Sequence, residues 1–193
     1  MFDDVWKRKE GLSWLDIGAG YGEVVEAVTA LAPPGSKIEG LEPMEPKREV
    51  ALARGLTVRD CYLSAEKGEF DFVSLINVFS HIPDFPEFLG DLKKVLPVGG
   101  EFFLETGDFS DLDVSELTNE LNLPDHLVFA NEKNLTECLT RAGFTVVGVK
   151  KERMDTVLHC TKLIVKTLIG RKVSLAFPYR SRYRAMMIRA QRT

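Results

Sequence analysis

A short apolar segment followed by three closely spaced glycines constrains the fold of this chain more than any other feature. Leu12–Ile17 is predicted as a buried strand, Gly18–Gly22 as a tight turn, and the stretch from Tyr21 to Leu31 as a helix with an apolar face. Glycines in such a turn let backbone N–H groups and a helix N-terminus approach a bound ligand with no Cβ in the way. The segment therefore predicts an α/β domain with a nucleotide-like ligand at this turn.

The spacing of the glycines separates two classes of nucleotide-binding protein. Gly18 and Gly20 fit the dinucleotide fingerprint G-x-G-x-x-G, but Glu23 occupies its third glycine position and the third glycine falls at Gly22. The pattern is instead G-x-G-x-G, preceded by Asp16. This spacing disfavours a nicotinamide-dependent oxidoreductase.

A carboxylate follows the next predicted strand at the expected place. Glu42 ends the strand Ser36–Leu41, 24 residues after Gly18. In nucleotide-binding α/β domains an acid at this position holds ribose hydroxyls. Glu42 is therefore a candidate ribose acceptor, with a solvated carboxylate as the alternative.

The rest of the chain alternates between predicted helices and strands, as in a doubly wound sheet. We expect helices at 45–54, 85–96, 131–142 and 152–169, with a short one at 114–121, and strands at 57–59, 70–76, 101–105, 145–149 and 184–190. The last of these should lie beside the strand at 145–149. The loosely patterned stretch 106–131 follows the carboxyl end of a strand, which predicts a substrate-facing insertion.

Composition indicates a soluble globular protein of one domain. Its 193 residues are 45% hydrophobic and 28% charged, and no apolar run approaches the length of a membrane span. The first ten residues lack the apolar centre of a signal peptide. Cys61, Cys138 and Cys160 lie far apart with no C-x-x-C, which suits reduced thiols and predicts a cytoplasmic protein without a zinc site.

Several motifs, taken in their order along the chain, give it a specific resemblance to one protein family. The segment from Asp16 to Gly22 (DIGAGYG), followed by Glu42, resembles the first two motifs of class I S-adenosylmethionine-dependent methyltransferases. Four more segments match in order: 70–77 (FDFVSLIN), 80–84 (SHIPD), 96–104 (LPVGGEFFL) and 141–147 (RAGFTVV). The resemblance covers roughly residues 12–150 and says little about the substrate.

The resemblance implies a fold, a cofactor and a division of the chain. The fold is a single Rossmann-like, doubly wound seven-stranded sheet, mostly parallel with an antiparallel last strand and with helices on both faces. Residues 1–193 form one domain: 12–105 as the cofactor-binding half, 106–131 as the insertion, and 132–193 as a C-terminal helix and strand hairpin. Relatives usually place tens of residues before the first strand and this chain has eleven, so either the domain is trimmed or a lid over the cofactor comes from elsewhere.

The same resemblance assigns residues to S-adenosylmethionine. The implied contacts are Asp16, Gly18, Ala19, Gly20, Tyr21, Gly22, Glu42, Pro43, Asp60, Cys61, Tyr62, Leu63, Asn77 and Val78. Many relatives carry an acid where Tyr62 stands, so an acid-to-adenine contact does not carry over directly, although Asp60 is close by. No metal is expected. Methyl transfer needs alignment of nucleophile, methyl and sulfur and, for a neutral acceptor, removal of a proton.

Two histidines are candidates for the general base that accepts this proton. His81 lies in a loop that lines the active site in relatives, and His126 lies in the predicted insertion; a structural role is the alternative for each. His159 is expected to be structural or exposed. Arg180, Arg182 and Arg184 sit in a tail of residues 171–193 with seven Lys or Arg and no acid, against 18 basic and 29 acidic residues in 1–170.

These observations favour methyl transfer to an oxygen or nitrogen of a small molecule such as a sugar or a phosphate-bearing metabolite. The alternatives are an RNA or protein methyltransferase that uses the basic tail, and a non-catalytic protein that retains the fold. The acidic body argues against broad nucleic-acid binding, because that affinity rests on phosphate neutralisation. We expect no membrane partner, and a monomer or homodimer.

Overall fold

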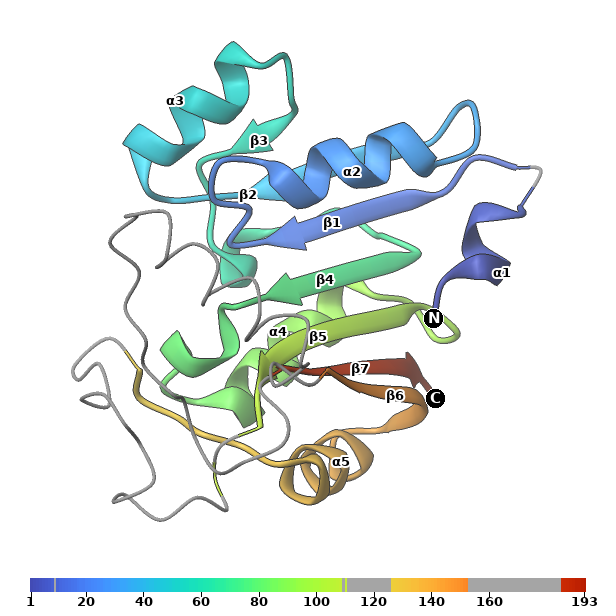
Figure 1. Ribbon diagram of the computed structural model, residues 1–193, viewed down its shortest axis with the longest axis vertical. Helices are drawn as coiled ribbons and strands as arrows, with labels where there is room; N and C mark the ends of the chain where they lie inside the picture. The colour runs from blue at the N-terminus through green and yellow to red at the C-terminus, as the bar shows by residue number, and fades with distance from the viewer. Residues whose placement is uncertain (9, 109, 111–125, 153–184) are drawn as a thin grey trace, which may run out of the picture.

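A seven-stranded sheet forms the centre of the computed structural model, which describes residues 1–8, 10–108, 110, 126–152 and 185–193 (Figure 1). The strands are β1 (Ser13–Ile17), β2 (Lys37–Leu41), β3 (Val58–Arg59), β4 (Phe72–Ile76), β5 (Glu101–Gly107), β6 (Phe144–Glu152) and β7 (Ala185–Arg192). The helices are α1 (Asp3–Trp6), α2 (Glu23–Leu31), α3 (Glu45–Ala53), α4 (Phe85–Val95) and α5 (Glu132–Arg141), with 3-10 turns η1 (Leu63–Ala65) and η2 (Phe79–His81).

The strand order is β3-β2-β1-β4-β5-β7-β6, and only β7 runs against the others. The chain therefore reverses its direction of winding between β1 and β4, which is the switch point where open α/β sheets bind ligands. The arrowheads of the parallel strands point to one edge in Figure 1. This confirms the predicted sheet, including its antiparallel last strand.

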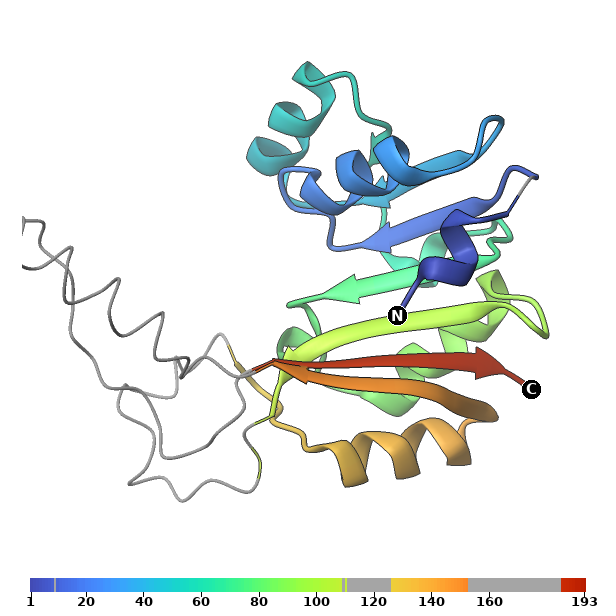
Figure 2. The same cartoon turned by 45° about the vertical axis from the view of Figure 1, so that its right-hand side comes forward.

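Alternating side chains along the central strands separate two apolar layers. Trp14 of β1 and Phe72 of β4 pack with Val5 and Val28, which places α1 and α2 on one face of the sheet. Figure 2 shows α1 and α2 on this same face. The neighbouring residues in the strands, among them Leu15, belong to the larger cluster on the opposite face, which includes residues of α4 and α5. Helices therefore cover both faces, as predicted.

The N-terminal helix α1 is held to the sheet by a buried cation. The guanidinium of Arg189 on β7 donates hydrogen bonds to both carboxylate oxygens of Asp4 and to both of Glu101, and also to the carbonyl of Met1. These bonds raise the pKa of Arg189 and lower the pKa of Asp4 to about 2. The Arg189 guanidinium also lies 5.4 Å from the centre of the Phe2 ring.

Most element boundaries differ from the sequence prediction by up to three residues, and two of the differences concern the predicted helices at 21–31 and 152–169. The helix predicted from Tyr21 starts at Glu23, because Gly22 adopts a left-handed conformation (φ 88°) that a helix cannot include. A helix predicted to begin at Glu152 is wrong at that residue, which instead ends strand β6. The rest of the 152–169 helix, the 114–121 helix, Cys160, His159 and the three tail arginines lie outside the described residues.

Among the described residues there is no helix of the length and apolar character that crossing a lipid bilayer requires. This result concerns only helices in the part of the chain that the structure describes.

Candidate active site

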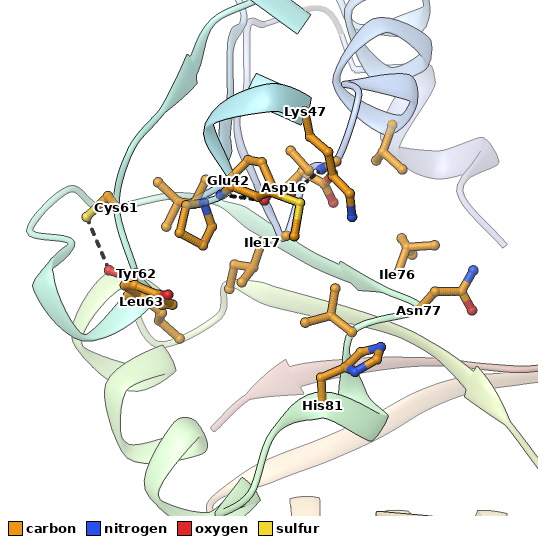
Figure 3. Close-up of a pocket in the computed structure, with 18 of the residues that line it drawn as sticks. Asp16, Ile17, Glu42, Lys47, Cys61, Tyr62, Leu63, Ile76, Asn77 and His81 are labelled. Atoms are coloured by element: carbon orange, nitrogen blue, oxygen red, sulfur yellow. Dashed lines mark hydrogen bonds between the residues drawn. The ribbon is translucent and has the colours of Figure 1, made fainter. Parts of the chain in front are cut away.

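A cavity of about 790 Å³ lies at the carboxyl edge of the sheet, at the switch point between β1 and β4. That volume lies in the range of small-molecule and cofactor sites. Figure 3 shows residues that line it, with Asp16 and Glu42 across from Asn77 and His81. The lining residues are Asp16, Ile17, Gly18, Ala19, Gly20, Glu23, Val24, Leu41, Glu42, Pro43, Met44, Lys47, Cys61, Tyr62, Leu63, Ile76, Asn77, Val78 and His81.

The glycine turn between β1 and α2 has a backbone that side chains would disturb. Gly18, Gly20 and Gly22 all have positive φ, at 69°, 57° and 88°. A Cβ on Gly18 would lie 2.5 Å from Cγ2 of Val78, which is too close for any real contact. The turn therefore brings the backbone against the cavity wall at a position that only glycine can occupy without a shift of the loop after β4.

Glu42 joins the glycine turn to the loop after β2. Its Oε2 accepts a hydrogen bond from the N–H of Gly20, and its Oε1 accepts one from the N–H of Met44, both at 2.8 Å. The residue is 6% exposed and lines the cavity. Each carboxylate oxygen has further acceptor capacity, so Glu42 can receive two adjacent hydroxyl groups while it holds both loops.

Arg48 on α3 fixes the other side of this loop. Its guanidinium donates to the carbonyls of Glu42, at 2.9 Å, and Pro43, at 3.2 Å. The same group forms an ion pair with Asp60 at 3.3 Å. The Asp60 side chain, which is 67% exposed, is therefore turned to Arg48 and is not among the residues that line the cavity.

Asp16 is a buried carboxyl group at the end of β1. Ser74 Oγ donates to Asp16 Oδ1 at 2.5 Å, and Trp14 Nε1 donates to Ser74 Oγ at 2.8 Å. Asp16 is 2% exposed, and burial raises its pKa to about 7, against the lowering effect of the Ser74 hydrogen bond; the charge of Glu23 raises it further. This carboxyl group can therefore hold or release a proton near neutral pH.

Asn77 follows β4 in a conformation that is uncommon for a residue with a side chain. Its φ is 57°, and no other non-glycine residue in the described ranges has a positive φ. Its N–H donates to the carbonyl of Glu105 at 3.2 Å. Asparagine tolerates this left-handed conformation better than most residues, which explains how β4 can turn sharply into the cavity wall here.

A second, smaller cavity of about 260 Å³ adjoins the first and shares Asn77 with it. Its other lining residues are Ser80, Thr106, Gly107, His126, Val128, Phe129 and Ala185. The His126 ring meets the His81 ring edge to face, with 5.2 Å between the ring centres. The Ser80 carbonyl accepts hydrogen bonds from the N–H groups of Leu127, at 2.7 Å, and Val128, at 3.3 Å, so the two histidine segments are joined by backbone.

The structure brings most of the predicted site residues together. Twelve line the larger cavity: Asp16, Gly18, Ala19, Gly20, Glu42, Pro43, Cys61, Tyr62, Leu63, Asn77, Val78 and His81. Tyr21, Gly22 and Asp60 do not line it, and His126 lines the smaller cavity. For each of these residues, contact with a ligand stays a prediction.

Lining residues that the sequence analysis missed include Glu23 and Lys47. Glu23 opens α2 directly after the glycine turn, so the strand–turn–helix pattern alone could have placed it at the site. Lys47 reaches the cavity from the first turn of α3, and nothing in the sequence pattern distinguishes it from a solvated lysine. No group of three or more His, Cys, Asp or Glu that could bind a metal occurs among the described residues.

Comparison with protein families identifies the chain. Residues 3–149 match the methyltransferase domain family, so the chain belongs to that family. Curated relatives include the ubiquinone biosynthesis O-methyltransferases of Pectobacterium atrosepticum, 30% identical over 113 residues (52% of this chain and 46% of the relative), and of Methylobacterium nodulans, 32% identical over 108 residues (50% and 41%). The chain thus spans about half the length of these curated relatives.

Solved structures confirm the fold. A SAM-dependent methyltransferase from Archaeoglobus fulgidus superimposes with a TM-score of 0.67 at 17% identity, over 95% of this chain and 87% of the other. Phosphoethanolamine N-methyltransferase 2 from Haemonchus contortus, solved in complex with S-adenosyl-L-methionine, gives a TM-score of 0.69 at 17% identity, over 99% and 51%. At this identity the likeness shows the Rossmann-like architecture and leaves the substrate open.

Proposed function

We propose that this chain binds S-adenosylmethionine in the larger cavity and transfers its methyl group to an oxygen or nitrogen of a small molecule. The observation that carries the proposal is the position of Glu42, whose buried carboxylate bridges the glycine turn and the loop after β2 at the wall of a cofactor-sized cavity. The family of the chain and the bound S-adenosyl-L-methionine of the Haemonchus contortus structure support the choice of cofactor.

The residues of the cavity suit the parts of this cofactor. Glu42 would accept the two ribose hydroxyls, and Met44 with Tyr62 offers exposed apolar surface for the adenine ring. Asp16 lies where it can attract a cationic amino-acid end, and Gly18 allows backbone to approach the ligand. The cofactor supplies an electrophilic methyl group on a sulfonium centre.

The smaller cavity is our candidate for the acceptor site. Among the described residues that line it there is no Lys or Arg, and its polar groups are neutral hydroxyls, an amide and the His126 imidazole. We therefore favour an uncharged, hydroxylated acceptor of about one ring, such as a sugar, over a phosphate-bearing one. A neutral hydroxyl loses one proton on methylation. Either His126, at the acceptor cavity, or His81, at the cofactor cavity, would accept it.

The names of relatives support both acceptor atoms. The curated relatives are O-methyltransferases, and the Haemonchus contortus protein is an N-methyltransferase. We also propose that the protein acts in the cytoplasm, since Cys61 and Cys138 are both free thiols. A monomer or homodimer remains our proposal for its oligomeric state.

Calorimetric titration with S-adenosylmethionine tests the cofactor site. Glu42→Ala should weaken binding by about 10- to 100-fold, because hydrogen bonds to a charged carboxylate contribute about 1.5–3 kcal/mol. Glu39→Ala is a matched control on β2, the strand that Glu42 follows, since Glu39 pairs with Lys37 and Arg59 away from the cavity. Equal affinity of Glu42→Ala and the wild type would refute the ribose assignment.

Methyl transfer is tested with methyl-labelled S-adenosylmethionine and panels of acceptors. Neutral hydroxylated rings, amines, phosphorylated metabolites, RNA and protein should be assayed separately for label. We expect label in the neutral hydroxyl or amine panel. Label only in RNA or protein would favour the macromolecular alternative, and cofactor binding without transfer to any panel would favour a non-catalytic role.

A further inference from the structure

Trp14, Ser74 and Asp16 form a hydrogen-bond chain whose direction is determined by chemistry. An indole nitrogen can only donate, so Ser74 Oγ must accept from Trp14. The single hydroxyl proton of Ser74 is then directed to Asp16 Oδ1. Trp14 and Asp16 are each 2% exposed and Ser74 is fully buried, so water does not compete for these bonds.

The consequence for Asp16 is that its two oxygens have different roles. Oδ1 is always occupied as an acceptor, whether the carboxyl group is charged or neutral. Within the described part of the chain no hydrogen bond reaches Oδ2, although Asp16 lines the cofactor cavity. Oδ2 is therefore the atom that carries a proton or meets a ligand.

The charged groups around the cavity favour a cation at this position. Glu23 from α2 lines the same cavity. Glu42 after β2, Lys47 from α3 and His81 from η2 line it as well (Figure 3). Without a cationic ligand, burial and the charge of Glu23 both favour the protonated form of Asp16. With one, the attraction between the ligand and the carboxylate favours the ionised form.

We propose that Ser74, itself held by Trp14, is a positioning residue that directs Asp16 Oδ2 into the cavity, where Asp16 holds a proton that the cationic cofactor displaces on binding. The displaced proton passes to the solvent, and the carboxylate that forms pairs with the positive end of the ligand. This inference rests on the proposed function, because it takes S-adenosylmethionine as the cation.

Proton release can be measured directly. S-adenosylmethionine is titrated calorimetrically between pH 5.5 and 7.5, below the pKa of an α-amino group at about 8, in two buffers of different ionisation enthalpy. Because Asp16 has its pKa near 7, we expect release of close to one proton at pH 6 and affinity that falls about tenfold for each lower pH unit. Above pH 7 this dependence should flatten.

Substitution of Ser74 distinguishes a positioning role from a structural one. Ser74→Ala removes the hydrogen bond that favours the charged carboxylate, so the midpoint of the pH dependence should rise by about one unit. The affinity of Ser74→Ala for S-adenosylmethionine should then be about tenfold weaker than that of the wild type at pH 6. The difference between the two affinities should become smaller as the pH rises. A merely structural effect would weaken binding equally at every pH.

Two indole variants provide a matched comparison. Trp14→Phe keeps a ring but removes the N–H, and it should move the midpoint in the same direction as Ser74→Ala by a smaller amount. Trp6→Phe alters a ring that stacks on Trp14, at 5.7 Å between ring centres, without touching the hydrogen-bond chain. It should leave the midpoint where the wild type has it.

Two cavity variants test the source of the proton. Asp16→Asn should abolish the release, whereas His81→Asn should keep it; the opposite result would assign the proton to His81 and overturn the inference. Binding of S-adenosylmethionine with no proton release, or a Ser74→Ala midpoint equal to wild type, would overturn it while leaving the proposed function intact. No binding at any pH would overturn both.

Discussion

Replacing Asp16 by asparagine should stabilise the folded protein, and more so at high pH. The folded state holds a proton on Asp16 up to a pKa of about 7, whereas the unfolded chain loses it near 3.8. Between these values the folded state binds more protons than the unfolded state, so stability falls as the pH rises across the interval. A difference of about three pKa units corresponds to about 4 kcal/mol at pH 8.5.

The Asp16→Asn variant does not lose this stability as the pH rises, because its side chain is neutral at every pH. Its carbonyl oxygen can still accept the Ser74 hydrogen bond, so the packing around β1 and β4 is retained. The wild type loses about half of this 4 kcal/mol of stability above pH 5.5. The free energy of unfolding of Asp16→Asn relative to wild type should therefore increase by about 2 kcal/mol from pH 5.5 to pH 8.5.

Urea unfolding of both proteins at the two pH values, followed by circular dichroism, measures this difference. Other titrating groups are common to both proteins and cancel when the two free energies of unfolding are subtracted. Equal m-values are needed as evidence that the unfolded states are comparable. A difference that stays constant with pH, or that shrinks at pH 8.5, would refute the raised pKa of Asp16.

Two further substitutions test features of the fold and site. Gly18→Ala places a Cβ 2.5 Å from Val78 at a position of positive φ. We expect a loss of stability of about 1–3 kcal/mol in thermal unfolding and weaker cofactor binding in calorimetry. A melting temperature equal to that of the wild type would show that the turn relaxes freely. Arg189→Met leaves the partly buried Glu101 carboxylate without its cation and frees Asp4, so urea unfolding should show a loss of about 3 kcal/mol. An unchanged free energy of unfolding would mean that water replaces the guanidinium.

Much of the fold follows from local sequence pattern. The apolar run in β4 is a signal that a single segment carries by itself. The pairing of strands is different, because it depends on residues far apart. A register shift between Val146 and Gly148 opposite β7 has no local signature, and β6 continues to Glu152, past its predicted end at residue 149.

The residues of the site show the same difference between local sequence pattern and long-range pairing. The glycine turn and Glu42 could be identified from spacing, since a strand, a turn and a helix determine where their backbone lies. Ser74 was hidden within an apolar run, and its contact with Asp16 appears only when β1 and β4 are paired in register across 58 residues of sequence. The reach of Lys47 into the cavity likewise depends on how α3 is placed, which no periodicity specifies.

The position of β7 has a consequence for synthesis of the protein. β7 fills the gap between β5 and β6, although it is the last strand of the sheet in the sequence. Until residues 185–192 leave the ribosome, the hydrogen-bonding edge of β5 that β7 will cover stays unpaired, and such an edge is a template for intermolecular pairing. The nascent chain should therefore be prone to aggregation until these residues emerge, and a stop codon before Ala185 should yield insoluble protein although every described residue of the larger cavity has already been made.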